Sequence, residues 1–180
     1  MKKIVLVFGL IAGLIVTGMM VYGTLQMKNN EHFQDSMVLG YTTMVVAFSL
    51  IFVGVKNFRD KHNNGVISFG KAFRIGLYIT LIASTMYVGA WLIEYYFFFP
   101  DFTEKYTACV IKDAKKSGAT QVELNAKMAE MAQMQEMYKN PLFVVLFTYL
   151  EIFPVGLIIT LICAFLLKKK RKPEDQFLAS

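Results

Sequence analysis

Two glutamates stand inside long apolar runs of the sequence, where an acidic residue is costly. Glu151 lies in FTYLEIFPVG and Glu94 in WLIEYYFFFP, so each has aromatic neighbours and a proline downstream. An acid within hydrocarbon is by default a candidate for binding or proton transfer. It would provide a proton or cation site, or a ligand pocket open to the outer face. The alternative role is a tether between helix ends, which we favour because both acids lie toward a membrane interface.

Tyrosine hydroxyls are the predicted partners of these carboxylates, because a phenol can donate a hydrogen bond to them. Pro154 has no backbone N–H, which leaves the carbonyl near Leu150 without its helical bond. Together these features predict a small polar site within the membrane. Its candidate residues are Glu151, Glu94, Tyr149, Tyr41, Tyr22 and Pro154.

The sequence carries no other pattern that indicates catalysis. It has no CxxC pair, no HExxH motif and no serine elbow. His32 and His62 fall in loops on opposite sides, and Cys109 and Cys163 on opposite halves of the bilayer. We therefore expect no enzyme activity, no metal site, no cofactor and no disulfide between the two cysteines. Cys109 would be a free thiol, a link between two copies of the chain or, as we prefer, a small buried side chain.

Four apolar blocks dominate a chain of 180 residues that is 56% hydrophobic and 18% charged. They run over 4–25, 37–55, 75–99 and 141–167 and hold no Lys or Arg. Each is long enough to cross a bilayer core of about 30 Å, and a helix satisfies its own backbone there. We predict an all-α, integral-membrane four-helix bundle with spans at about 4–25, 37–55, 73–99 and 141–167. The first block is too long for a cleaved signal peptide, so we expect it to be retained.

Basic residues indicate how the chain is threaded through the membrane. They flank the first and last spans and fill the loop between spans two and three, at Lys2, Lys3, Lys56, Arg59, Lys61, Lys71, Arg74 and KKKRK over 168–172. The positive-inside rule places both termini and this loop in the cytoplasm. The net charge of +6 is then explained by flanks that meet anionic headgroups, and we expect no nucleic-acid partner. The residues 173–180 read as a short cytoplasmic tail.

Both acids are predicted to lie in the outer half of the membrane. At 1.5 Å per residue, Glu151 lies about 25 Å from the inner interface marked by Lys168. On the same rise, Glu94 lies about 30 Å from the interface marked by Arg74. The two carboxylates should therefore sit at similar heights on separate helices.

The long loop between spans three and four predicts an amphipathic helical hairpin outside the membrane, over 101–140. Gly118 suits a helix end, and TQVE from Thr120 to Glu123 matches a capping box. Leu124, Met128, Met131 and Tyr138 then follow at helical spacing. Six lysines balance six acids in this segment. Its Met-rich stripe would bind a partner or, as we prefer, pack on a neighbouring helix or the bilayer.

Small residues line one face of each span. The clearest packing positions are Gly9, Gly13, Gly76 and Gly156. Such faces let helix backbones approach closely. They would form either a homodimer seam, for instance through Gly9 and Gly13, or the interior of one bundle, which we prefer.

Two stretches carry a resemblance to a known family. The entry to span three, Gly65-x-x-Ser68-Phe69-Gly70-x-Ala72-Phe73, and the motif Glu151-x-x-Pro154-x-Gly156 in span four resemble a bacterial integral-membrane family known only as domain of unknown function 4199. The likeness covers about residues 4–172. It implies a four-helix protein of the bacterial inner membrane, and it implies no reaction, ligand or catalytic residue.

These observations favour a non-enzymatic envelope, scaffold or interaction protein, with 1–172 as a single membrane domain. Its expected partners are the bilayer and either another protein or a second copy of the chain. The alternative is a small proton- or cation-coupled transporter that uses Glu151 and Glu94, although no inverted repeat with broken helices supports it.

Overall fold

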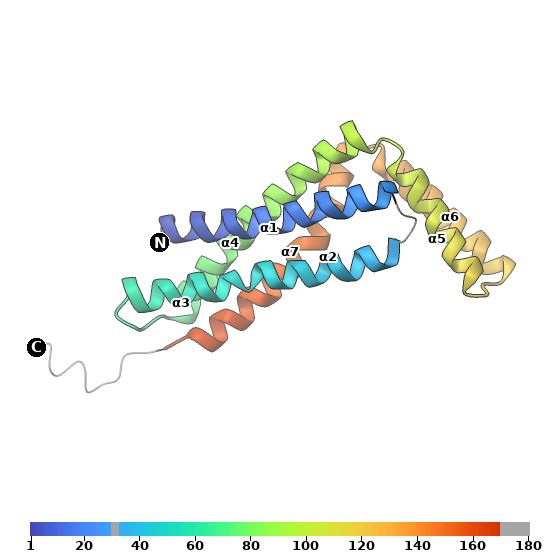
Figure 1. Ribbon diagram of the computed structural model, residues 1–180. Helices are drawn as coiled ribbons and strands as arrows, with labels where there is room; N and C mark the ends of the chain where they lie inside the picture. Colours follow the sequence, from blue (N-terminus) through green and yellow to red (C-terminus); the bar gives the residue numbers. More distant parts are fainter. Residues whose placement is uncertain (30–32, 170–180) are drawn as a thin grey trace, which may run out of the picture.

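The computed structural model describes residues 1–29 and 33–169, and this part of the chain is mainly α-helical (Figure 1). The helices are α1 (Lys2–Asn29), α2 (Phe33–Phe48), α3 (Leu50–His62), α4 (Phe69–Ile93), α5 (Phe102–Lys116), α6 (Gln121–Tyr138) and α7 (Pro141–Leu167). A π-helical segment, η1 (Glu94–Phe98), extends α4. The expected loop residues Glu31 and His32, the basic residues 170–172 and the tail 173–180 lie outside the described residues.

Four of the described helical segments are long and apolar enough to cross a membrane. They are Lys2–Leu25, Val38–His62, Phe69–Phe98 and Pro141–Leu167. Their outward-facing side chains are largely apolar: Leu14, Val38 and Leu150 are each more than 60% exposed. A water-soluble protein rarely exposes so much apolar surface, so this pattern indicates a membrane protein.

The second of these segments differs from the sequence-based boundaries. The helix continues past Val55 to His62, because the polar residues after the apolar block, among them Lys56 and Arg59, are also compatible with a helix. Ser49 marks the junction of α2 and α3, where its backbone N–H donates to the carbonyls of Val45 and Val46.

Helix α4 occupies the centre of the bundle and packs most extensively against α1 and α7. Glycines make these contacts close. A methyl group at Gly13 would meet Met86 and Ala83 of α4, and one at Gly9 would meet Ile82. Gly76 of α4 packs against α7, and Gly156 of α7 packs against α4. All four glycines singled out in the sequence thus contact helices of the same chain.

Three helix starts are capped by side chains, and the one at Thr120 is the capping box predicted from the sequence. The Ser68 hydroxyl accepts a hydrogen bond from the backbone of residue 71. Thr120 and Glu123 form a reciprocal capping box at α6, and the Asn140 side chain caps α7, with Pro141 as its first residue. Such caps satisfy backbone N–H groups that have no partner within the helix.

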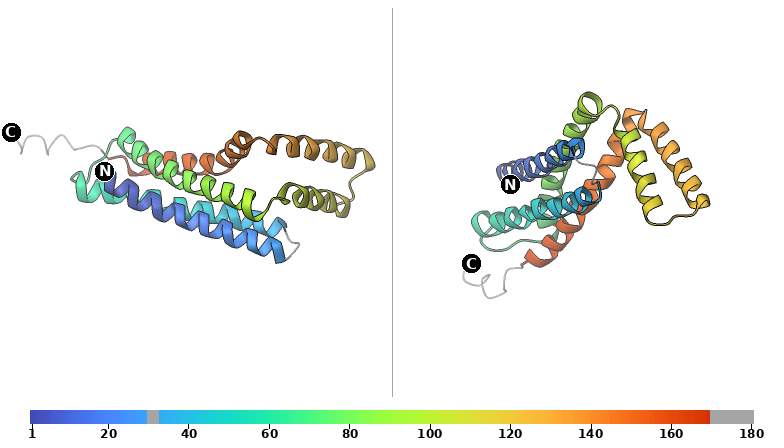
Figure 2. Two further views of the ribbon diagram at one scale, coloured as in Figure 1. Left: turned by 90° about the horizontal axis from the view of Figure 1, so that it is seen from above. Right: turned by 45° about the vertical axis from the view of Figure 1, so that its right-hand side comes forward.

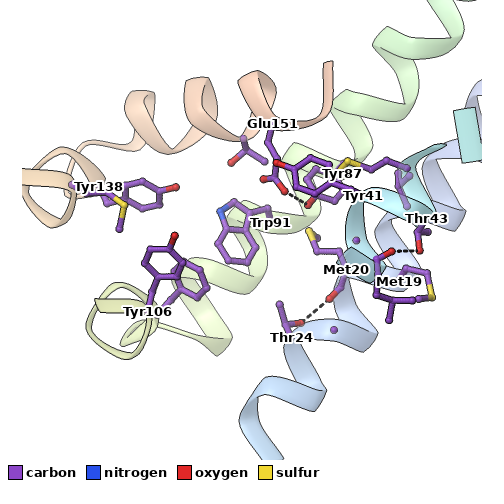
Figure 3. A pocket seen from close by; sticks show the side chains of 18 residues that line it. Met19, Met20, Thr24, Tyr41, Thr43, Tyr87, Trp91, Tyr106, Tyr138 and Glu151 are labelled. Atoms are coloured by element: carbon purple, nitrogen blue, oxygen red, sulfur yellow. Dashed lines mark hydrogen bonds between the residues drawn. The ribbon is translucent and has the colours of Figure 1, made fainter. Parts of the chain in front are cut away.

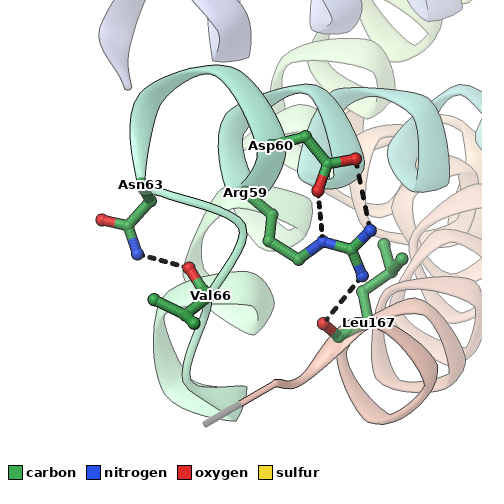
Figure 4. Close-up of polar contacts among 5 residues, drawn as sticks. All are labelled: Arg59, Asp60, Asn63, Val66 and Leu167. Carbon is green, nitrogen blue, oxygen red and sulfur yellow. Dashed lines mark hydrogen bonds and ion pairs between the residues drawn. The ribbon is translucent and has the colours of Figure 1, made fainter. Parts of the chain in front are cut away.

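The α3–α4 loop is joined to the end of α7 (Figure 4). Arg59 pairs with Asp60 at 2.6 Å and donates a longer bond, 3.5 Å, to the Leu167 carbonyl. Ile67 and Lys169 exchange two backbone hydrogen bonds of 3.0 and 2.9 Å. The start of α1, this loop and the end of α7 thus lie at one end of the bundle (Figures 1 and 2).

Helices α5 and α6 lie side by side at the opposite end and project away from the bundle (Figure 2). Gln135 of α6 joins them by donating to the Thr107 hydroxyl at 3.0 Å. At their turn, Gly118 adopts φ +78°, a conformation that favours glycine. Leu124 and Met131 of α6 are buried, but Met128 is 44% exposed, so the apolar stripe expected along α6 is only partly covered.

Candidate functional site

An aromatic cluster joins α5 and α6 to the bundle. Trp91 of α4 packs edge-on against Phe102 of α5, with ring centroids 4.8 Å apart. Tyr95 packs against Tyr138 of α6 at 5.8 Å. Edge-to-face pairs of this kind are favoured by the charge distribution of the rings, so the cluster holds α5 and α6 over the end of the bundle.

A cavity of about 300 Å³ lies where this cluster meets the bundle (Figure 3). Six helices contribute to its wall. The lining residues are Val16, Met19, Met20, Gly23, Thr24, Leu39, Gly40, Tyr41, Thr43, Met44, Tyr87, Trp91, Phe102, Tyr106, Met134, Tyr138, Thr148 and Glu151. The wall is mainly aromatic and sulfur-containing, with a few hydroxyl groups and one carboxylate, the mixture that is common in small-molecule sites.

Glu151 brings its carboxylate into this cavity from α7. The Tyr87 hydroxyl of α4 donates a hydrogen bond of 3.4 Å to its Oε1, and Tyr41 of α2 lies beside the pair (Figure 3). Glu151 and Tyr41 are both exposed. The carboxylate is therefore held by a long, weak bond and keeps acceptor capacity for a further partner.

Glu94 occupies a different environment at the junction of α4 and η1. Only 7% of its surface is exposed. The Thr24 hydroxyl of α1 interacts with its carboxyl group, while Oε2 has no hydrogen-bond partner among the described residues. Thr24 lines the cavity and Glu94 does not, so Glu94 lies behind the wall. Its π-helical setting is one that often marks functional sites.

The charge of Glu151 also contributes to the pKa of two tyrosines, one in α5 and one in α6. Burial raises the pKa of Tyr138 to about 12, and the Glu151 charge adds to this rise. Burial is likewise the main cause that raises the pKa of Tyr106, with smaller contributions from Glu130 and Glu151. Both phenols stay protonated at neutral pH and remain available as hydrogen-bond donors.

A family model described as "Protein of unknown function (DUF4199)" matches residues 7–169. The chain belongs to this family. No match was found among curated proteins or among solved structures. The match to DUF4199 covers all four apolar segments together with α5 and α6, so it confirms the resemblance seen in the sequence, and it assigns no activity.

The structure separates the site residues predicted for this DUF4199 chain. Glu151 and Tyr41 line the cavity, but Glu94, Tyr149, Tyr22 and Pro154 do not. The Tyr149 hydroxyl instead shares a 2.8 Å hydrogen bond with Thr85. Tyr22 is 50% exposed, and Pro154 is exposed one turn beyond Glu151. The six candidate residues therefore do not share this cavity, because the two acids lie in different surroundings.

The cavity also contains residues that the sequence does not single out as partners of Glu151. Tyr87, Tyr106 and Tyr138 belong to three other helices, α4, α5 and α6. The one available signal was the spacing of Tyr87 and Trp91, four residues apart and hence on one face of α4. Over residues 1–29 and 33–169, no group of three or more His, Cys, Asp or Glu residues could hold a metal ion.

Proposed function

We propose that this DUF4199 chain is a non-enzymatic, multi-pass protein of the bacterial inner membrane that binds a small molecule in the Glu151 cavity. Residues 1–172 form one membrane domain in this proposal, followed by the tail 173–180. The observation that carries it is the cavity itself, whose wall combines six aromatic side chains with the weakly paired carboxylate of Glu151. Concave sites with a few polar groups in a mainly apolar wall are typical of ligand binding.

The proposed orientation places both termini in the cytoplasm and α5–α6 outside. It is supported by basic residues that share one end of the bundle, among them Lys2, Lys61 and Lys169. The opposite end carries α5 and α6, whose acids and lysines are equal in number. Because cytoplasmic flanks are enriched in Lys and Arg, the cavity would open in the outer leaflet beneath α5–α6.

A binding role suits the chemistry of the cavity better than catalysis. Glu151 and Tyr87 offer a charge and a hydroxyl group, which orient a ligand. The protein partner or second copy expected from the sequence would meet the chain on α5–α6, where Val122 is 78% exposed. In this proposal the ligand site lies between the helical bundle and α5–α6, the helices that would contact the partner.

Native mass spectrometry of protein extracted with its surrounding lipid tests the proposal. Gly40 lines the cavity, and a Cβ atom added at this position meets nothing within 4 Å. Gly40→Leu should therefore reduce the free volume and remove a bound small molecule. Gly18→Leu is the matched control, because Gly18 is equally unobstructed and does not line the cavity. Identical spectra for wild type and both variants, with no small-molecule adduct, would contradict the proposal.

A proton- or cation-coupled carrier is the second candidate function. It is favoured by Glu94, a buried acid with one oxygen that has no partner among the described residues and that is separated from the cavity by Thr24. Glu94→Gln and Glu151→Gln would each abolish proton-coupled uptake in liposomes if the two acids form a relay. Unchanged flux in both variants would exclude the carrier and leave the binding role standing.

A further inference from the structure

The cavity has an unbalanced charge. Glu151 is its only charged lining residue, and no ion pair found among the described residues includes it. Within a bilayer, a carboxylate that has no positive partner carries a large energetic cost. The Tyr87 hydrogen bond of 3.4 Å is long for an O–H···O contact and offsets only part of this cost.

Aromatic rings from several helices line the same cavity as this carboxylate. Tyr41 comes from α2, Tyr87 and Trp91 from α4, Tyr106 from α5 and Tyr138 from α6. Aromatic faces attract cations, and clustered faces with a nearby acid are a known means of holding ammonium groups. No lysine or arginine contributes to the wall, so the described part of the chain supplies no cation of its own.

Resting on the proposed function, we infer that the ligand of this cavity is an organic cation: an ammonium group on a small apolar body. The ammonium group pairs with Glu151 and lies against the aromatic faces, while Met20, Met44 and Met134 contact the apolar part. Thioether side chains adapt readily to apolar shapes. A free amine and the ammonium of a lipid headgroup share this chemistry.

Benzyltrimethylammonium is a suitable probe, because its charge is permanent. Its neutral isostere, neopentylbenzene, has the same shape without the charge. Binding is measured by equilibrium dialysis of the whole chain in dodecylmaltoside micelles, which contain no ammonium group, with empty micelles as the blank. Trp91 is the only tryptophan of the chain and lines the cavity, so its fluorescence reports whether the probe occupies this site.

The cation should bind saturably, change Trp91 emission, and bind at least about tenfold more tightly than the isostere. Glu151→Gln should abolish this preference, and Glu104→Gln, which removes an exposed acid of α5, should preserve it. Tyr138→Leu should weaken cation binding about 2–5-fold and Tyr138→Phe much less, because the phenyl face is retained.

The outcomes separate this inference from the proposed function. Equal binding of cation and isostere, unaffected by Glu151→Gln, overturns the cation assignment and leaves a ligand cavity. No binding of either probe overturns both. Displacement of the probe by phosphatidylethanolamine, but not by phosphatidylglycerol, identifies a lipid headgroup as the source of the ammonium group; displacement by neither lipid identifies a free amine.

Discussion

The hydroxyl oxygens of Thr80 in α4 and Thr160 in α7 lie 3.1 Å apart, and both residues are fully buried. Each threonine also contacts the place where the opposite helix has a glycine: Thr160 lies against Gly76, and Thr80 against Gly156. In this antiparallel pair of helices, each threonine of one helix therefore packs against a glycine of the other. Because this contact fixes how α7 is rotated against α4, it also determines which residues α7 presents at the cavity.

A double-mutant cycle on this threonine pair should show coupling. Thr80→Val or Thr160→Val alone leaves one hydroxyl buried without its partner, so each should lower the free energy of unfolding by about 1 kcal/mol. The double variant should cost about as much as one single variant, which gives a coupling near 0.5–1 kcal/mol. Reversible unfolding in mixed micelles measures these values, and strictly additive effects would show that the hydrogen bond contributes nothing.

Gly156→Ala should destabilise the bundle. The added methyl would meet Thr80 and the Phe48 ring, and overpacking of this kind costs about 1–3 kcal/mol. Gly89→Ala is the control, because nothing lies within 4 Å of its new methyl group and alanine is the better helix former. The thermal midpoints of the two variants should move in opposite directions; a neutral Gly156→Ala would mean that α4 and α7 are less closely packed.

Cysteine labelling should report the proposed orientation. In a background with Cys109→Ser and Cys163→Ala, a cysteine at exposed Ser117 of the α5–α6 turn should react with a membrane-impermeant maleimide on intact cells. A cysteine at exposed Lys61 of α3 should react only after the membrane is opened, because the basic end is expected in the cytoplasm. The reverse pattern would invert the topology.

The titration of Tyr138 should reveal the charge state of Glu151. Its raised pKa, about 12, exceeds the ordinary value near 10, so the folded phenol holds its proton more tightly than the unfolded one. The resulting stabilisation is fully present below pH 10 and is lost as the pH rises through about 12. Carbon-13 NMR of labelled tyrosine, with Tyr138→Phe to assign the signal, measures the midpoint.

Glu151→Gln should lower the Tyr138 midpoint toward 10, since one source of negative charge is removed. Burial, the larger cause of the shift, would keep the midpoint above the ordinary value. A midpoint that is unchanged by Glu151→Gln would show that Glu151 is uncharged at these pH values.

Several local features could be predicted from short stretches of the chain. The apolar runs predicted four membrane-length helices, because a backbone in hydrocarbon must pair within its own segment. The capping box of Thr120 and Glu123 predicted a helix start, because the Thr120 side chain reaches an N–H group only three residues away. The apolar pattern did not predict that α3 continues through polar residues to His62. The hydropathy of a segment indicates which residues lie in the membrane, but a helix can extend beyond them.

The composition of the site depends on contacts between helices instead. Glu151 and Glu94 look equivalent in the sequence, yet one faces the cavity and the other lies buried behind Thr24. Tyr87 pairs with Glu151 across 64 positions. Periodicity indicates which residues share a face of one helix, but not the rotation and register at which two helices meet. The rotation and register of α4 and α7 are fixed by the packing of Gly76 and Gly156 against threonines, and these close contacts form only in the assembled bundle.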